Sequence, residues 1–78
     1  MSDNIENNLG EQPIGRIMAD HNVRAHDLVA ISDVQLTFKM ISKARKGRRL
    51  TANVKSKVRN ALNKCTSQEY ALADLFNY

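Results

Sequence analysis

Ten lysine and arginine side chains lie between Val34 and Gln68, in a stretch that contains no aspartate or glutamate. These cations are Lys39, Lys43, Arg45, Lys46, Arg48, Arg49, Lys55, Lys57, Arg59 and Lys64. The rest of the chain holds eight acidic side chains against two basic ones, so the net charge of +4 divides into +10 on this basic stretch (residues 34–68) and −6 elsewhere. A region of one sign attracts polyanions and speeds their encounter. The pattern favours a nucleic-acid partner. The alternative is that these charges only form a solvated face of the protein.

Other reactive side chains give little indication of catalysis. His21 and His26 have no cysteine or acidic cluster at metal-ligand spacing, and the sequence contains no glycine-rich phosphate loop. We interpret both histidines as surface or core residues, and Cys65 as a small buried apolar side chain. No Ser/His/acid arrangement stands out, and a small helical unit offers little room for a pocket. We therefore expect a protein that is not an enzyme and that binds no metal or cofactor.

Length and composition favour one small helical domain. The chain has 78 residues, 42% of them hydrophobic, with only three Gly and one Pro, fewer turn residues than a β-architecture needs. No apolar run approaches the roughly 18 residues that cross a membrane, and the first residues lack the order of a signal peptide. A soluble, cytoplasmic, all-α protein is expected.

Apolar spacing predicts five short helices after an acidic, disordered tail at residues 1–12. The folded domain is expected to cover residues 13–78. Its helices are predicted near residues 13–22, 25–32, 35–46 and 51–65, followed by a last helix opened by a capping box of Thr66 and Glu69. That last helix is expected to turn Leu72, Leu75 and Phe76 toward the core.

The helix predicted at residues 35–46 should carry its cations on one side. Leu36, Met40, Ile41 and Ala44 mark the inward face. At 100° per residue the opposite face carries Phe38, Lys39, Ser42, Arg45 and Lys46, with Gln35 and Lys43 at its margins. Gly47 suits the left-handed residue that ends a helix, and Thr51 suits the N-cap of the next helix.

Two short helices joined by a turn of about three residues form the helix-turn-helix arrangement, in which the second helix carries basic side chains on its outer face. Residues 14–76 resemble the lambda-repressor-like DNA-binding domains of the Cro and cI type. The second half is also similar to the headpiece of the lactose-repressor family. The segments that agree with the residue order of that family are Val34-Gln35, Lys46-Gly47, Leu50-Thr51 and Lys55-Ser56-Lys57-Val58 through Ala61. This sequence departs from the pattern at Val29, where a small Ala is usual, and at Asp33, where Gly is usual. The segment 34–47 is also about two residues longer than in the lactose-repressor type.

The resemblance implies a small transcriptional regulator that binds double-stranded DNA sequence-specifically, reading the major groove with the helix at about 35–46. Base edges would be contacted by Gln35, Phe38, Lys39, Ser42 and Lys43, with Thr37 as a cap. Gln pairs with adenine, Lys reaches guanine acceptors, and an apolar side chain touches a thymine methyl group. Phosphates would be contacted by Arg45, Lys46, Arg48, Arg49, Thr51, Lys55 and Lys57.

Two alternatives remain open from the sequence. The same basic stretch would serve a DNA- or RNA-binding protein without sequence preference. An antitoxin-like or adaptor protein would instead bind a partner through Leu75-Phe76-Asn77-Tyr78. The aromatic side chains Tyr70, Phe76 and Tyr78 also suggest a homodimer formed through the C-terminal helix, unless they fold back onto the core of their own domain.

Overall fold

The computed structural model describes residues 10–78, so most of the expected acidic tail lies outside the described residues. Gln12 was expected to end that tail, yet it is buried. Its main-chain N–H donates to the Arg45 carbonyl at 3.3 Å, and its Oε1 accepts the N–H of Asn77 at 2.7 Å. The folded part therefore begins before Pro13, because contacts distant in sequence fix Gln12 in place.

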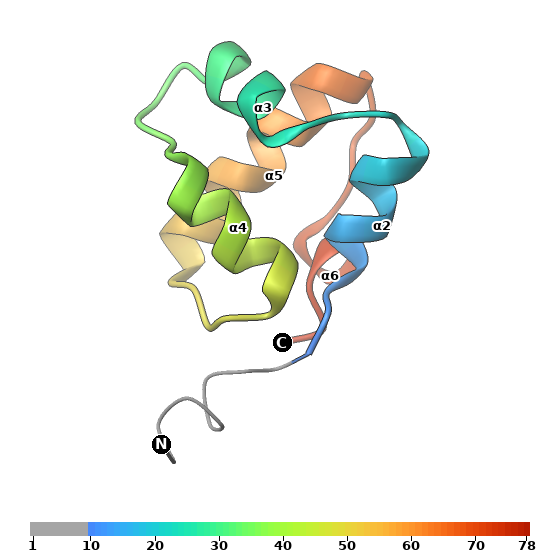
Figure 1. Cartoon of the computed structure of the whole chain (residues 1–78), viewed down its shortest axis with the longest axis vertical. Helices are drawn as coiled ribbons and strands as arrows, with labels where there is room; N and C mark the ends of the chain where they lie inside the picture. The colour runs from blue at the N-terminus through green and yellow to red at the C-terminus, as the bar shows by residue number, and fades with distance from the viewer. Residues whose placement is uncertain (1–9) are drawn as a thin grey trace.

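Residues 10–78 form five helices and no strand, which confirms the all-α prediction (Figure 1). The helices are α2 (Pro13–Asp20), α3 (Ala25–Ile31), α4 (Phe38–Lys46), α5 (Ala52–Thr66) and α6 (Leu72–Leu75). α4 packs against α2, α3 and α5, and α6 packs against α2 and α5. None of the described helices is long and apolar enough to cross a membrane.

Several helix ends follow the predicted capping chemistry. Gly47 ends α4 with φ at 82°, in the left-handed region that favours glycine. Thr51 caps α5, where its Oγ1 accepts the N–H of Val54 at 3.2 Å. Asn22 follows the end of α2 with φ at 56°. The predictions for Gly47 and Thr51 are confirmed because each depends on the backbone only within a few residues of the cap.

The start of α4 corrects the sequence prediction. The helix begins at Phe38 rather than Gln35, because Thr37 caps it and its Oγ1 accepts the N–H of Met40 at 3.1 Å. Leu36 is buried as predicted, but it belongs to the connection before α4 and not to the helix itself. The connection between α3 and α4 consequently spans Ser32 to Thr37, longer than the expected turn of about three residues.

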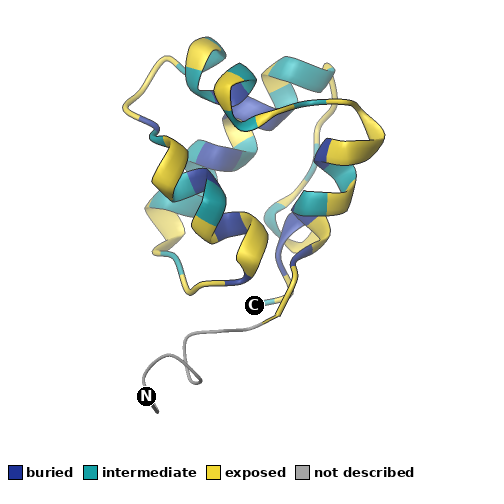
Figure 2. Cartoon of the chain, viewed as in Figure 1, coloured by how far each residue is buried: buried dark blue, intermediate teal, exposed yellow. Residues whose placement is uncertain are grey.

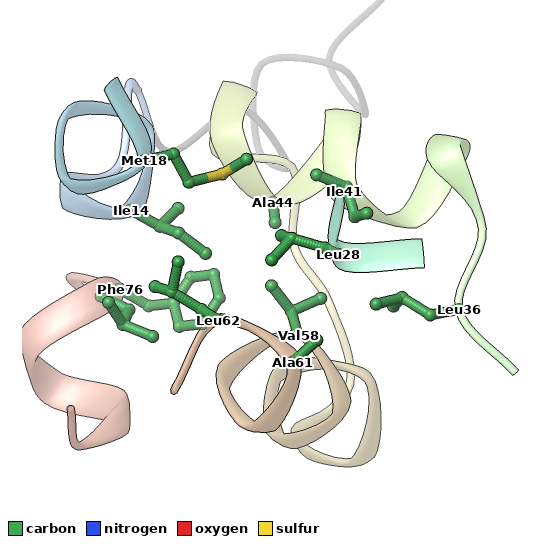
Figure 3. Packing of buried hydrophobic residues seen from close by; sticks show 11 residues of the cluster. Ile14, Met18, Leu28, Leu36, Ile41, Ala44, Val58, Ala61, Leu62 and Phe76 are labelled. Carbon is green, nitrogen blue, oxygen red and sulfur yellow. The ribbon is translucent and has the colours of Figure 1, made fainter. Parts of the chain in front are cut away.

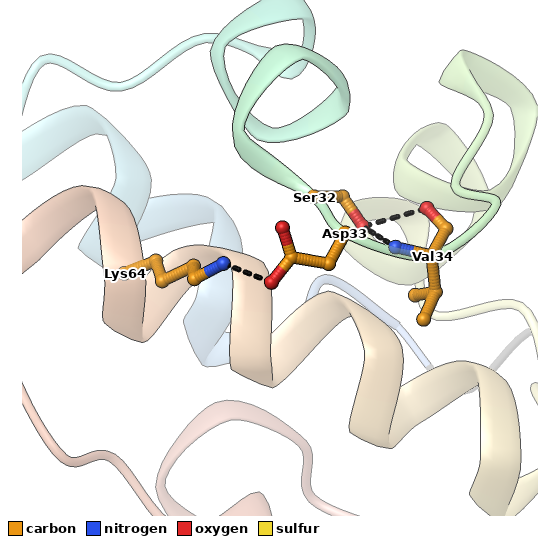
Figure 4. Close-up of polar contacts among 4 residues, drawn as sticks. All are labelled: Ser32, Asp33, Val34 and Lys64. Carbon is orange, nitrogen blue, oxygen red and sulfur yellow. Dashed lines mark hydrogen bonds and ion pairs between the residues drawn. The ribbon is translucent and has the colours of Figure 1, made fainter.

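Polar contacts hold the beginning of this connection (Figure 4). The Ser32 hydroxyl donates to the Val34 carbonyl at 2.8 Å and accepts the Val34 N–H at 3.3 Å. The Asp33 carboxylate pairs with the Lys64 ammonium group of α5. Both of these charged side chains are largely exposed, so the ion pair orients the connection more than it stabilises the fold.

The predicted capping box of Thr66 and Glu69 is wrong. α5 continues through Thr66, whose hydroxyl donates to the Leu62 carbonyl at 2.8 Å within the helix. The main-chain N–H of Ala71 donates instead to the Asp74 carboxylate at 2.9 Å, so α6 begins at Leu72. A threonine can bond backward to the carbonyl four residues earlier, and here that contact replaces the cap.

One apolar core joins all five helices (Figure 3). The buried side chains are Ile14, Met18, Leu28, Leu36, Ile41, Ala44, Val58, Ala61, Leu62, Leu75 and Phe76. Figure 2 shows buried positions on the inner sides of the helices and exposed positions on their outer sides. The predicted inward positions Ile41 and Ala44 of α4 are buried, so its cationic side faces outward.

Candidate nucleic-acid interface

The outward side of α4 presents four of the five predicted base-contacting residues. We define the α4 face as Phe38, Lys39, Ser42, Lys43 and Lys46. Ser42 is half-buried and the other four are exposed, with Phe38 at 57% of its surface. The helix contains no acidic residue, so positive charge and one aromatic ring dominate this surface.

The cations of α4 are not neutralised by nearby acids. Within residues 10–78 the ion pairs join His26 to Asp27 and Lys64 to Asp33, and neither involves α4. Of the ten cations in the basic stretch, Lys64 is therefore the one paired with a described carboxylate. An array of uncompensated charges on one helix attracts an anionic polymer and supplies the contacts that hold it.

Gln35 is the predicted base-contacting residue that the structure separates from the others. It is exposed in the connection before α4, outside the helix on which it was placed. The cause is the Thr37 cap, which moves the helix start by three positions. The α4 face therefore lacks the amide side chain that would pair with adenine.

The basic loop (residues 47–51) continues the positive surface beyond α4. Arg48 and Arg49, for which phosphate contacts stay a prediction, are both exposed there. Tyr78 holds this loop, since its hydroxyl accepts the Leu50 N–H and donates to the Arg48 carbonyl, both at 3.1 Å. Thr51 uses its side-chain oxygen to cap α5.

Lys55 and Lys57, both predicted to contact phosphates, lie in different surroundings. Lys55 Nζ donates to the main-chain oxygen of Tyr78 at 3.0 Å and lies 4.3 Å from the centre of the Tyr78 ring. Lys57 lines a separate hollow beside Asp33 and Val34, not the one beside the basic loop. Their spacing of two residues places them on different sides of α5. The Lys55 ammonium group therefore interacts with Tyr78 of its own domain, and Lys57 is separated from the basic loop.

A groove runs between α2 and α4 and contains a cation that the sequence analysis missed. Arg16 of α2 lines it together with Arg45, Lys46 and Arg48. Arg16 lies outside the basic stretch, so segregation of charge along the sequence gave no signal for it. Gly15 of α2 faces Arg45 of α4, and a Cβ at Gly15 would lie 4.0 Å from the Arg45 side chain, an ordinary van der Waals distance. Packing of α2 against α4 therefore joins cations from two parts of the chain.

The aromatic residues expected at a dimer surface contact other residues of their own domain. Phe76 is buried, and Tyr78 packs edge-on against it with ring centres 5.8 Å apart. The Tyr70 hydroxyl hydrogen-bonds to His21 Nε2 at 2.9 Å. This packing favours the alternative that these rings fold back onto their own core, and a dimer through α6 stays a prediction for sedimentation experiments.

The histidines and the cysteine show no arrangement for metal binding among residues 10–78, where no group of three or more His, Cys, Asp or Glu side chains gathers. His21 and His26 are exposed. Burial, and secondarily the Asp27 carboxylate, raise the pKa of the half-buried Cys65 thiol, so the reactive thiolate is disfavoured.

Comparison with known proteins gives no relative for this chain: no family model, no curated protein and no solved structure matches it.

Proposed function

We propose that this protein binds double-stranded DNA through the α4 face and acts as a small transcriptional regulator. The observation that carries the proposal is an exposed helix face with three lysines, one aromatic ring and no acid, on a helix whose cations pair with no described carboxylate. One α-helix fits the major groove of B-DNA, and lysines can reach both phosphates and guanine acceptors there.

For the finer assignment, a lambda-repressor-like helix-turn-helix, the order of the helices gives support, while the α3–α4 connection departs from the expected geometry. The α3–α4 pair precedes the basic loop and α5 in the expected order, and the helices enclose one core. The connection from Ser32 to Thr37 is longer than a helix-turn-helix turn of about three residues. We therefore base the proposal on the charge and exposure of α4 rather than on the connection.

Binding without sequence preference is a second candidate, favoured by the position of Gln35. With Gln35 outside α4, the α4 face offers lysines and one half-buried hydroxyl but no amide or guanidinium group for bidentate contact with a base. Lysine acts as a point charge and discriminates less by geometry.

Selection from random duplex DNA separates these candidates. An enriched motif supports a regulator, and retention without a motif supports the general binder. No retention would refute DNA binding and leave the adaptor protein as the remaining candidate.

The location of the contact surface on α4 is tested by the double variant Lys39→Ala, Lys43→Ala, which should weaken DNA binding by about tenfold or more. Lys64→Ala is the matched control, since Lys64 is an exposed lysine of α5 paired with Asp33. Equal effects of the two changes would argue against α4 as the contact surface.

A further inference from the structure

The α2–α4 groove has a cationic end and an apolar end. The main-chain N–H of Gln12, just before α2, donates to the carbonyl of Arg45 near the end of α4, so the two helices run in opposite directions (Figure 1). Arg16 in the first half of α2 consequently lies at the end of the groove that holds Arg45 and Lys46. Ala19 and Phe38 lie toward the other end.

Charge at the cationic end favours an anionic occupant. Four cations, Arg16, Arg45, Lys46 and Arg48, line the groove against a single acid, Glu11. None of these five side chains forms an ion pair with another described residue. Arginine suits phosphate because its planar guanidinium group donates two parallel hydrogen bonds to phosphate oxygens.

The apolar end suits the part of a nucleic-acid strand that carries no charge. Phe38 stands in the first turn of α4 and Arg45 in its last turn, seven residues or about 10 Å along the helix axis. Phe38 exposes more than half of its surface, while Ala19 and Ala25 leave space beside it. A deoxyribose or a base methyl group would contact this ring while neighbouring phosphates contact the arginines.

We infer that the α2–α4 groove holds the backbone of one DNA strand, with Arg16 as a phosphate-binding residue and Phe38 in contact with the adjoining sugar or base. This inference rests on the proposed DNA binding and adds α2 to the interface. It places a strand along one flank of α4, while Lys39 and Lys43, which do not line the groove, face the remainder of the site.

Fluorescence anisotropy of a labelled duplex tests the inference, with affinity measured over a range of salt concentrations. Arg16→Gln should weaken binding by about tenfold and make the slope of log affinity against log salt shallower by about 0.9, the value of one phosphate contact. Phe38→Ala should lower the affinity and leave the slope unchanged, because it removes no charge. Arg59→Gln is the matched control, since Arg59 lies on α5 outside the groove and hydrogen-bonds to Asn60.

Thermal unfolding of each variant will verify that it is folded. If Arg16→Gln behaves like Arg59→Gln while the Lys39, Lys43 double variant loses binding, the groove inference is overturned and the proposed function stands. If the unmodified protein does not bind DNA, both are overturned.

Inorganic phosphate at constant ionic strength distinguishes a strand from a small anion. A groove built for a strand should lose no more DNA affinity in phosphate than in chloride. Selective displacement of DNA by phosphate, abolished by Arg16→Gln, would show a small-anion site instead and overturn the inference.

Discussion

Removing the Tyr78 hydroxyl should destabilise the protein by releasing the basic loop. In Tyr78→Phe the ring keeps its contacts with Phe76 and Lys55, but the Leu50 N–H and the Arg48 carbonyl lose a shared partner. Two hydrogen bonds at about 0.5–1.5 kcal/mol each predict a loss of about 1–3 kcal/mol in the free energy of unfolding. For a domain of this size, each kcal/mol lowers Tm by about 4–8 °C.

Urea denaturation of the variant and the unmodified protein measures this loss. Tyr70→Phe is the control, because its hydroxyl has a hydrogen bond to the exposed His21 side chain and should be worth no more than about 1 kcal/mol. A Tyr78→Phe protein as stable as the unmodified one would refute the reasoning, since the hydroxyl could not then be holding the loop.

The same substitution predicts a change in pH dependence. Burial raises the pKa of Tyr78, and the Leu50 N–H and the Arg49 charge oppose this only in part. The folded pKa then lies above the unfolded value of about 10, so the stabilisation is fully present below about pH 10 and is lost as pH rises through the folded pKa. The free energy of unfolding should fall more steeply above about pH 10 in the unmodified protein than in Tyr78→Phe. Parallel curves would contradict this account.

Three further substitutions test local geometry by urea denaturation. Gly47→Ala should cost more than about 1 kcal/mol, because φ is 82° and the added Cβ would lie 1.7 Å from the Gly10 carbonyl oxygen; a neutral result would contradict that close approach. Gly15→Ala should stabilise α2 by about 0.5–1 kcal/mol, since its Cβ would meet Arg45 at an ordinary 4.0 Å; destabilisation would mean tighter packing of α2 on α4. Thr37→Ala should cost about 1 kcal/mol by removing the cap of α4, and an unchanged stability would argue against Phe38 as the helix start.

The sequence by itself determined the helical class, the location of the cations and several helix ends. The stripe of Val58, Ala61 and Leu62 predicts a buried face because each position repeats within one helix, and the structure buries all three. Gly47 and Thr51 were predictable because a left-handed residue and a capping hydroxyl act on the backbone beside them.

Only the tertiary structure decided which cations face outward together. Arg16 joins Arg45 because α2 packs along α4, while Lys55 is withdrawn by the main-chain oxygen and ring of Tyr78. Helical periodicity also placed Gln35 on α4, although the buried side chain of Leu36 and the Thr37 cap hold this segment outside the helix. The contacts of Arg16 and Lys55 join residues far apart in sequence, and Leu36 is buried in the core from a position outside α4. The spacing of residues along the chain cannot reveal these contacts, because they depend on how the helices pack around the common core.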